Sequence, residues 1–130
     1  MTMLKHWLTA AAVLAVVPTA SAARFFHIEL ERSQPAADST VRAAPTEIRL
    51  WFSERVQLPV TTVQLIGPDS ARVALGRPTQ AAGAGAPVVV TVQGPMRAGV
   101  QRVVWRTMAR DGHVARGAFT FMLAGASPAR

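Results

Sequence analysis

The chain lacks cysteine and tyrosine entirely, and it contains only three histidines among its 130 residues. Without cysteine it can form no disulfide, no thiolate-ligated zinc site, no Cys nucleophile and no redox pair. The few histidines do not fall into a recognisable Ser-His-Asp spacing, so we expect that the protein is not an enzyme. These absences leave binding functions as the class to consider.

The longest apolar run lies at the amino terminus, where Lys5 precedes the apolar stretch 7–17 and residues 20–22 read Ala-Ser-Ala. A positive start, a short apolar core and an A-x-A cleavage site are typical of a secretory signal peptide, with an uncleaved anchor as the alternative. We therefore expect residues 1–22 to be a signal peptide cleaved near Ala22, residues 23–123 to form one domain, and residues 124–130 to form a flexible tail. An exported protein without cysteine fits the periplasm, where disulfides are allowed but not required.

The formal net charge is +7, and Lys5 is the single lysine, so every basic residue of the expected mature domain is an arginine. A basic protein can indicate a nucleic-acid partner or an acidic membrane surface. Here the arginines occur singly along the chain and form no run or helical stripe. We interpret them as a compositional bias and expect no nucleic-acid partner.

The remaining chain has the patterns of β-structure throughout. Residues Glu47 to Phe52 alternate between apolar and polar, which is the period-two pattern of a half-buried strand. The segment 76–87 is rich in Gly, Ala and Pro and predicts a mobile loop. We expect seven short strands, at residues 25–30, 47–52, 62–66, 71–75, 88–93, 100–107 and 118–123. Their number and spacing predict an all-β, immunoglobulin-like β-sandwich with Greek-key connections.

Three residues are candidate metal ligands. Asp111 and His113 flank Gly112 between the last two expected strands, and His27 lies in the first. Two imidazoles and a carboxylate provide the nitrogen and oxygen donors that a tetragonal Cu(II) ion favours. The alternative is structural: His27 as a surface residue, and Asp111-Gly112 as an ordinary turn dipeptide.

Several short motifs follow one another along almost the whole expected mature chain. They are His27-x-x-Leu30-x-x-Ser33-x-Pro35-Ala36, Ala44-Pro45, Ile48-Arg49-Leu50-Trp51-Phe52-Ser53-Glu54, Trp105-Arg106, Asp111-Gly112-His113 and Gly117-x-Phe119-x-Phe121. This ordered set resembles the CopC family of periplasmic copper-resistance proteins, which have a β-sandwich domain.

The resemblance implies a role for five residues. His27, Asp111 and His113 stand at the family's Cu(II)-ligand positions, which are an amino-terminal histidine and the two ends of a D-x-H turn. Glu54 stands at a position near the metal, as a weak ligand or as a residue that supports a ligand. Trp105 is expected to pack beneath the turn, where a bound Cu(II) ion would quench its fluorescence.

The chain departs from the family pattern at its amino terminus. Cleavage after Ala22 or Ala23 leaves residues 24–26 ahead of His27, so the terminal amine is no longer the neighbouring donor. We expect such a site to be weaker or to recruit another ligand. Trimming that left Phe25 first would instead place His27 third and allow an amine–amide–imidazole chelate.

Two functions follow. The first is a periplasmic Cu(II) carrier or buffer, monomeric, which holds copper or passes it to a membrane partner of the CopD type. The second is an interaction module that binds copper weakly or not at all and docks its exposed Arg and Trp51 face onto a membrane copper transporter. A Cu(I) site is not supported, because Met96, Met108 and Met122 are widely spaced.

Overall fold

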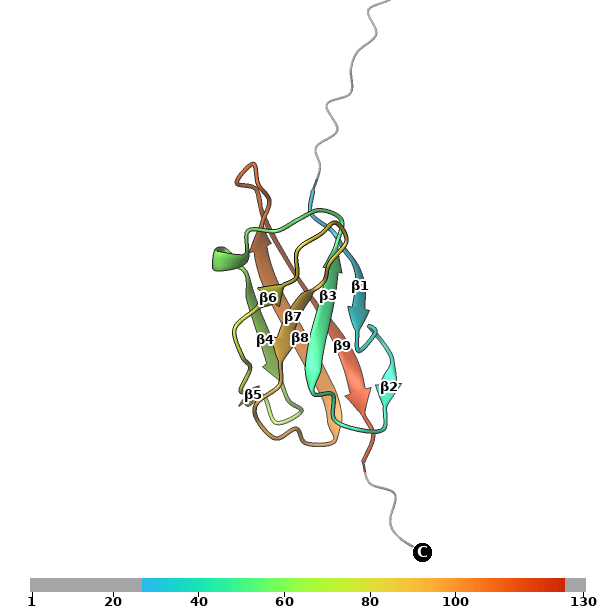
Figure 1. The fold of residues 1–130 in the computed structure, drawn as a ribbon. Coiled ribbons are helices and arrows are strands. Elements are labelled where there is room, and N and C mark those ends of the chain that lie inside the picture. Colours follow the sequence, from blue (N-terminus) through green and yellow to red (C-terminus); the bar gives the residue numbers. More distant parts are fainter. Residues whose placement is uncertain (1–26, 126–130) are drawn as a thin grey trace, which may run out of the picture.

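The computed structural model describes residues 27–125 as two β-sheets packed face to face. Figure 1 shows β1, β3, β7 and β6 in one layer and the longer β8 and β9 in the other. The hydrogen-bonded orders are β1-β3-β7-β6 and β2-β9-β8-β4-β5. The elements are β1 Leu30–Gln34, β2 Thr40–Val41, β3 Glu47–Phe52, the 3-10 turn η1 Leu58–Val60, β4 Thr62–Ile66, β5 Arg72–Val73, β6 Thr79–Gln80, β7 Val88–Thr91, β8 Gly99–Met108 and β9 Val114–Leu123. In this part of the chain no helix is long and apolar enough to span a membrane.

The expected all-β, immunoglobulin-like sandwich is confirmed, and β3 and β4 occupy the residues predicted for them. The expected hairpin of β4 and β5 is also present, with Leu65 opposite Val73. The last strand begins at Val114 rather than at Ala118, because the β8–β9 ladder continues without interruption from Gly99–Leu123 to Met108–Val114.

The prediction of a first strand over 25–30 agrees with the structure only at Leu30 and was wrong for residues 27–29. The strand begins at Leu30 and continues to Gln34, although the sequence Leu-Glu-Arg-Ser-Gln carries little apolar alternation. Its buried inward residue is Ser33, whose hydroxyl donates a hydrogen bond to the Pro35 carbonyl at 2.9 Å. A buried polar side chain with its own local partner does not produce the apolar pattern by which a strand is recognised. Residues 25 and 26 lie outside the described part.

Two short strands were not expected. β6 lies inside the segment 76–87 that was predicted to be a loop, and it pairs with β7. β2 pairs in parallel with β9, the only parallel pairing among the described strands. A two-residue strand has no period to detect, so neither could be found from alternation. The expected signal peptide and most of the expected tail fall outside the described residues.

The core lies between the two sheets. Its fully buried members include Ile48 and Leu50 of β3, Leu65 of β4 and Phe121 of β9. Trp105 of β8 is also buried, and its ring contacts Phe52 edge to face with the ring centroids 5.1 Å apart.

Trp105 lies directly opposite Gly117 on the neighbouring strand β9. A Cβ atom placed on Gly117 would be 2.5 Å from the nearest atom of the indole ring. Glycine therefore allows the indole to lie directly against the backbone of β9, and this contact fixes the ring near the end of the hairpin that carries the Asp111–His113 turn.

Candidate metal centre

The turn between β8 and β9 is closed by two backbone hydrogen bonds. The Ala109 N–H donates to the His113 carbonyl at 2.9 Å, and the Gly112 N–H donates to the Ala109 carbonyl at 3.0 Å. Gly112 has φ +90°, a backbone conformation that residues with a side chain rarely adopt. The glycine between Asp111 and His113 thus lets the chain reverse with both flanking side chains at the surface.

Asp111 and His113 bind each other within this turn. The His113 backbone N–H donates to Asp111 Oδ1 at 3.0 Å, and His113 Nδ1 lies 2.7 Å from Asp111 Oδ2. In a neutral imidazole one nitrogen donates and the other accepts. A carboxylate can only accept, so the neutral ring in this arrangement carries its proton on Nδ1 and leaves the lone pair of Nε2 free for a metal ion.

The electrostatics of the turn favour a charged carboxylate. The pKa of Asp111 lies below its ordinary value, chiefly because of the hydrogen bond from the His113 backbone N–H and then because of the hydrogen bond to the His113 side chain. Both side chains are more than half exposed. The turn therefore presents an ionised carboxylate beside an imidazole, both open to solvent.

The segment that carries His27 lies at the same end of the sandwich as this turn. The Glu29 N–H donates to Ser53 Oγ at 2.9 Å and the Ser53 N–H donates to the Glu29 carbonyl at 2.8 Å, which ties this segment to the residues just after β3. Figure 1 shows the blue start of the described chain and the β8–β9 turn together at the upper end. His27 is exposed and precedes the first strand.

The segment after β3 also reaches the β8–β9 turn. The Gln57 backbone N–H donates to the Met108 carbonyl at 2.9 Å, and its side-chain amide donates to the Ala109 carbonyl at 2.7 Å. Glu54, half-buried, lies on this segment. The fold thus gathers all four candidate ligand residues toward one end of the domain.

These four residues do not form a closed metal site. Within residues 27–125, no three His, Asp or Glu side chains lie close enough to hold a metal ion together. The structure brings Asp111 and His113 into contact and leaves His27 and Glu54 outside that pair. A complete set of protein ligands would require the His27 segment to approach the turn.

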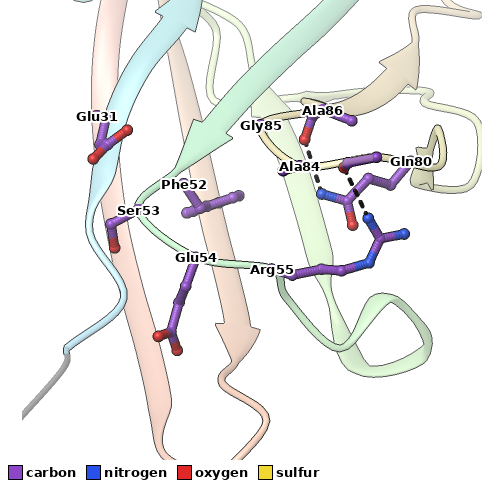
Figure 2. Close-up of a pocket in the computed structure, with 10 residues that line it drawn as sticks. Glu31, Phe52, Ser53, Glu54, Arg55, Gln80, Ala84, Gly85 and Ala86 are labelled. Atoms are coloured by element: carbon purple, nitrogen blue, oxygen red, sulfur yellow. Dashed lines mark hydrogen bonds between the residues drawn. The ribbon is translucent and has the colours of Figure 1, made fainter.

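The structure also contains a shallow hollow beside Glu54, which was not predicted from the sequence. It is lined by residues 52–55, Glu31, Gln80 and residues 83–86. Figure 2 shows Arg55 extending toward the loop, where it donates to the Gly83 carbonyl at 3.2 Å, while Glu54 points away from that loop. Gln80 closes the loop by donating to the Ala86 carbonyl at 2.9 Å. The signal that could have indicated it is the Gly/Ala-rich stretch, whose small residues leave space beside the strand end.

Among curated proteins, the chain is similar to copper resistance protein C from several bacteria. The protein from Escherichia coli is 34% identical over 123 residues, which is 90% of this chain and 94% of that protein. The protein from Xanthomonas campestris pv. juglandis is 29% identical over 115 residues, covering 84% of this chain and 89% of that protein.

Solved structures show the same fold. The crystal structure of PcoC, a methionine-rich copper resistance protein from Escherichia coli, matches with a TM-score of 0.60 and 34% identity, covering 75% of this chain and 98% of that one. CopC from Methylosinus trichosporium OB3b matches with a TM-score of 0.62 at 24% identity, covering 75% and 94%. The family model of the CopC domain matches residues 30–124, which include nearly all of the described sandwich. The chain is a member of the CopC family.

Proposed function

We propose that the chain is an exported Cu(II)-binding protein of copper resistance, which buffers copper or passes it to a membrane partner. The observation that supports it best is the Asp111–His113 pair, which offers an imidazole nitrogen and a carboxylate on one exposed turn. The similarity to copper resistance proteins supports the choice of metal. The pattern of residues 1–22 supports export.

The turn supplies part of a coordination sphere. The hydrogen bond to Asp111 leaves His113 Nε2 free to bind the metal ion. Asp111 contributes a negative charge, and it acts either as an oxygen ligand or by holding the imidazole in place. His27, on the neighbouring segment, is the residue that would complete the set. Nitrogen and oxygen donors together favour Cu(II) over the softer Cu(I).

The test is a Cu(II) titration of the purified protein, with its true amino terminus fixed by mass spectrometry. We expect one copper ion per chain and a tetragonal electron paramagnetic resonance spectrum with nitrogen hyperfine structure. Tryptophan fluorescence should fall in step, since Trp105 is packed in the hairpin that carries the turn. Adsorption of several weakly held ions without nitrogen hyperfine structure would contradict the proposal.

Copper affinity is expected to depend on pH in one direction. Imidazole binds a metal ion only in its neutral form, so affinity should fall as the pH drops below about 6 to 6.5. Asp111 does not add to this loss, because hydrogen bonds from His113 lower its pKa further below the pH range of the titration and its carboxylate stays ionised throughout. Titrations between about pH 5 and 8 would show the loss, and equal affinity across that range would count against histidine ligation.

The absence of a three-residue ligand group within residues 27–125 favours the second candidate, an interaction module with weak copper binding. The face expected to dock carries Trp51, which is half-buried and has the Arg32 guanidinium 3.9 Å above its ring centroid. Under this candidate, His113→Ala would leave the cellular function unchanged. A CopD-type partner and a monomeric state stay predictions under both candidates.

A further inference from the structure

The charges of the domain are divided unequally between its two sheets. The strands of the five-stranded sheet contain no Asp or Glu and four arginines, which are Arg72, Arg102, Arg106 and Arg116. The strands of the four-stranded sheet contain two acidic and two basic residues, which are Glu31, Arg32, Glu47 and Arg49. The excess positive charge is therefore concentrated in one layer.

Strand register places these four arginines on one surface. Successive side chains of a strand alternate between its faces, and the buried residues of β8 alternate with exposed Arg102 and Arg106. Arg116 lies directly opposite Arg106, while Arg102 and Arg72 flank Ile66 on either side. All four are exposed. We call this outer surface of β5, β4, β8 and β9 the arginine face.

The arginine face has no compensating negative charge from its own strands. Among the described residues, none of the four arginines lies within ion-pair distance of a carboxylate. Like charges directly opposite each other on adjacent strands destabilise a sheet, and Arg106 and Arg116 are such a pair. Within the described residues, Arg106 and Arg116 therefore face each other without a carboxylate that offsets their repulsion.

Apolar side chains are exposed on the same surface. Val100, Val114 and Met122 are 48%, 41% and 39% exposed, and each occupies an outward position of β8 or β9. The face is thus a sheet surface in which guanidinium groups alternate with aliphatic groups. That combination suits a partner that is anionic and also has an apolar layer just below its charges.

We propose that the arginine face binds the surface of a bilayer that contains anionic phospholipids. Guanidinium groups match phosphate oxygens with paired hydrogen bonds, and a headgroup layer offers such oxygens at adjustable positions. A planar, deformable partner can reach all four arginines of a broad sheet surface at once. The exposed valines and methionine would contact the acyl boundary beneath the headgroups.

The test is cosedimentation of the purified protein with vesicles of equal parts phosphatidylglycerol and phosphatidylcholine. The face variant carries Arg106→Gln and Arg116→Gln together. It should bind these vesicles about 30-fold more weakly, because each arginine near an anionic membrane surface contributes ~1 kcal/mol to binding. Its folding stability should be unchanged or higher, because the substitution removes a like-charge pair. The matched control is Arg42→Gln with Arg77→Gln, which removes the same charge from exposed connections outside the strands.

Retention of binding by the control variant and loss by the face variant would support the proposal. Equal losses in both variants would attribute the effect to net charge and overturn it. So would equal binding to vesicles of phosphatidylcholine alone, or no binding to phosphatidylglycerol vesicles by the unaltered protein. Tighter binding to polyglutamate or duplex DNA than to the vesicles would also overturn it, since the occupant would then be a different macromolecule.

Discussion

Gly117→Ala is expected to destabilise the domain by about 3 kcal/mol, the upper end of the usual range for an overpacked core. The new Cβ atom would lie 2.5 and 2.8 Å from two carbon atoms of the Trp105 indole. The ring cannot move away freely, because it is buried and its other contacts include the edge-to-face pair with Phe52. Against a typical total stability of roughly 5–15 kcal/mol, this loss would be large.

Urea unfolding followed by tryptophan fluorescence measures this change. The matched control is Gly125→Ala, because the nearest atom to its added Cβ is 3.7 Å away, an ordinary contact. If the clash with the indole is the cause, Gly117→Ala should lower the free energy of unfolding much less in a Trp105→Leu background, where the indole is absent. Equal costs in both backgrounds would place the destabilisation in the backbone of β9 and not in the contact.

His113→Ala is expected to weaken Cu(II) binding by more than about 100-fold. Losing a group that only orients a ligand typically costs about 10–100-fold in metal affinity, and His113 supplies the donor nitrogen itself. The hyperfine structure from this imidazole should disappear from the paramagnetic resonance spectrum. Arg110→Gln is the control, since it alters an exposed residue of the same turn that is not a metal ligand.

Asp111→Asn distinguishes two roles for the carboxylate. Asparagine keeps an oxygen that can accept from the His113 backbone N–H but loses the negative charge. If Asp111 only orients the imidazole, affinity should fall within the ~10–100-fold range. A loss as large as that of His113→Ala would identify Asp111 as a ligand, and unchanged affinity in both variants would contradict a copper site at this turn.

The parts of the fold that could be predicted are those in which burial repeats along the sequence. Ile48 and Leu50 alternate with exposed or half-buried residues, so β3 was recognised from its pattern. β1 was misplaced because its buried inward residue is Ser33. Hydrophobic period identifies strands that bury apolar side chains and misses edge strands that bury polar ones.

The candidate metal site could also be predicted only in part. Asp111 and His113 are two residues apart, so a local turn was enough to bring them together, and this part could be expected from the sequence. Whether His27 reaches them depends on the path of the segment ahead of β1, which no local pattern specifies. The arginine face was also hidden, because Arg106 and Arg116 become neighbours only through the register of β8 with β9.

The short outer strands have a consequence for solubility. Three of the four sheet edges, β2, β5 and β6, are strands of two residues, and the fourth, β1, has a register irregularity between Leu30 and Arg32. Long flat edges are templates for addition of a strand from another chain, whereas short or bulged edges offer few free backbone groups in a row. The described domain therefore resists edge-to-edge aggregation without relying on any disulfide, even while its cationic face stays open to a partner.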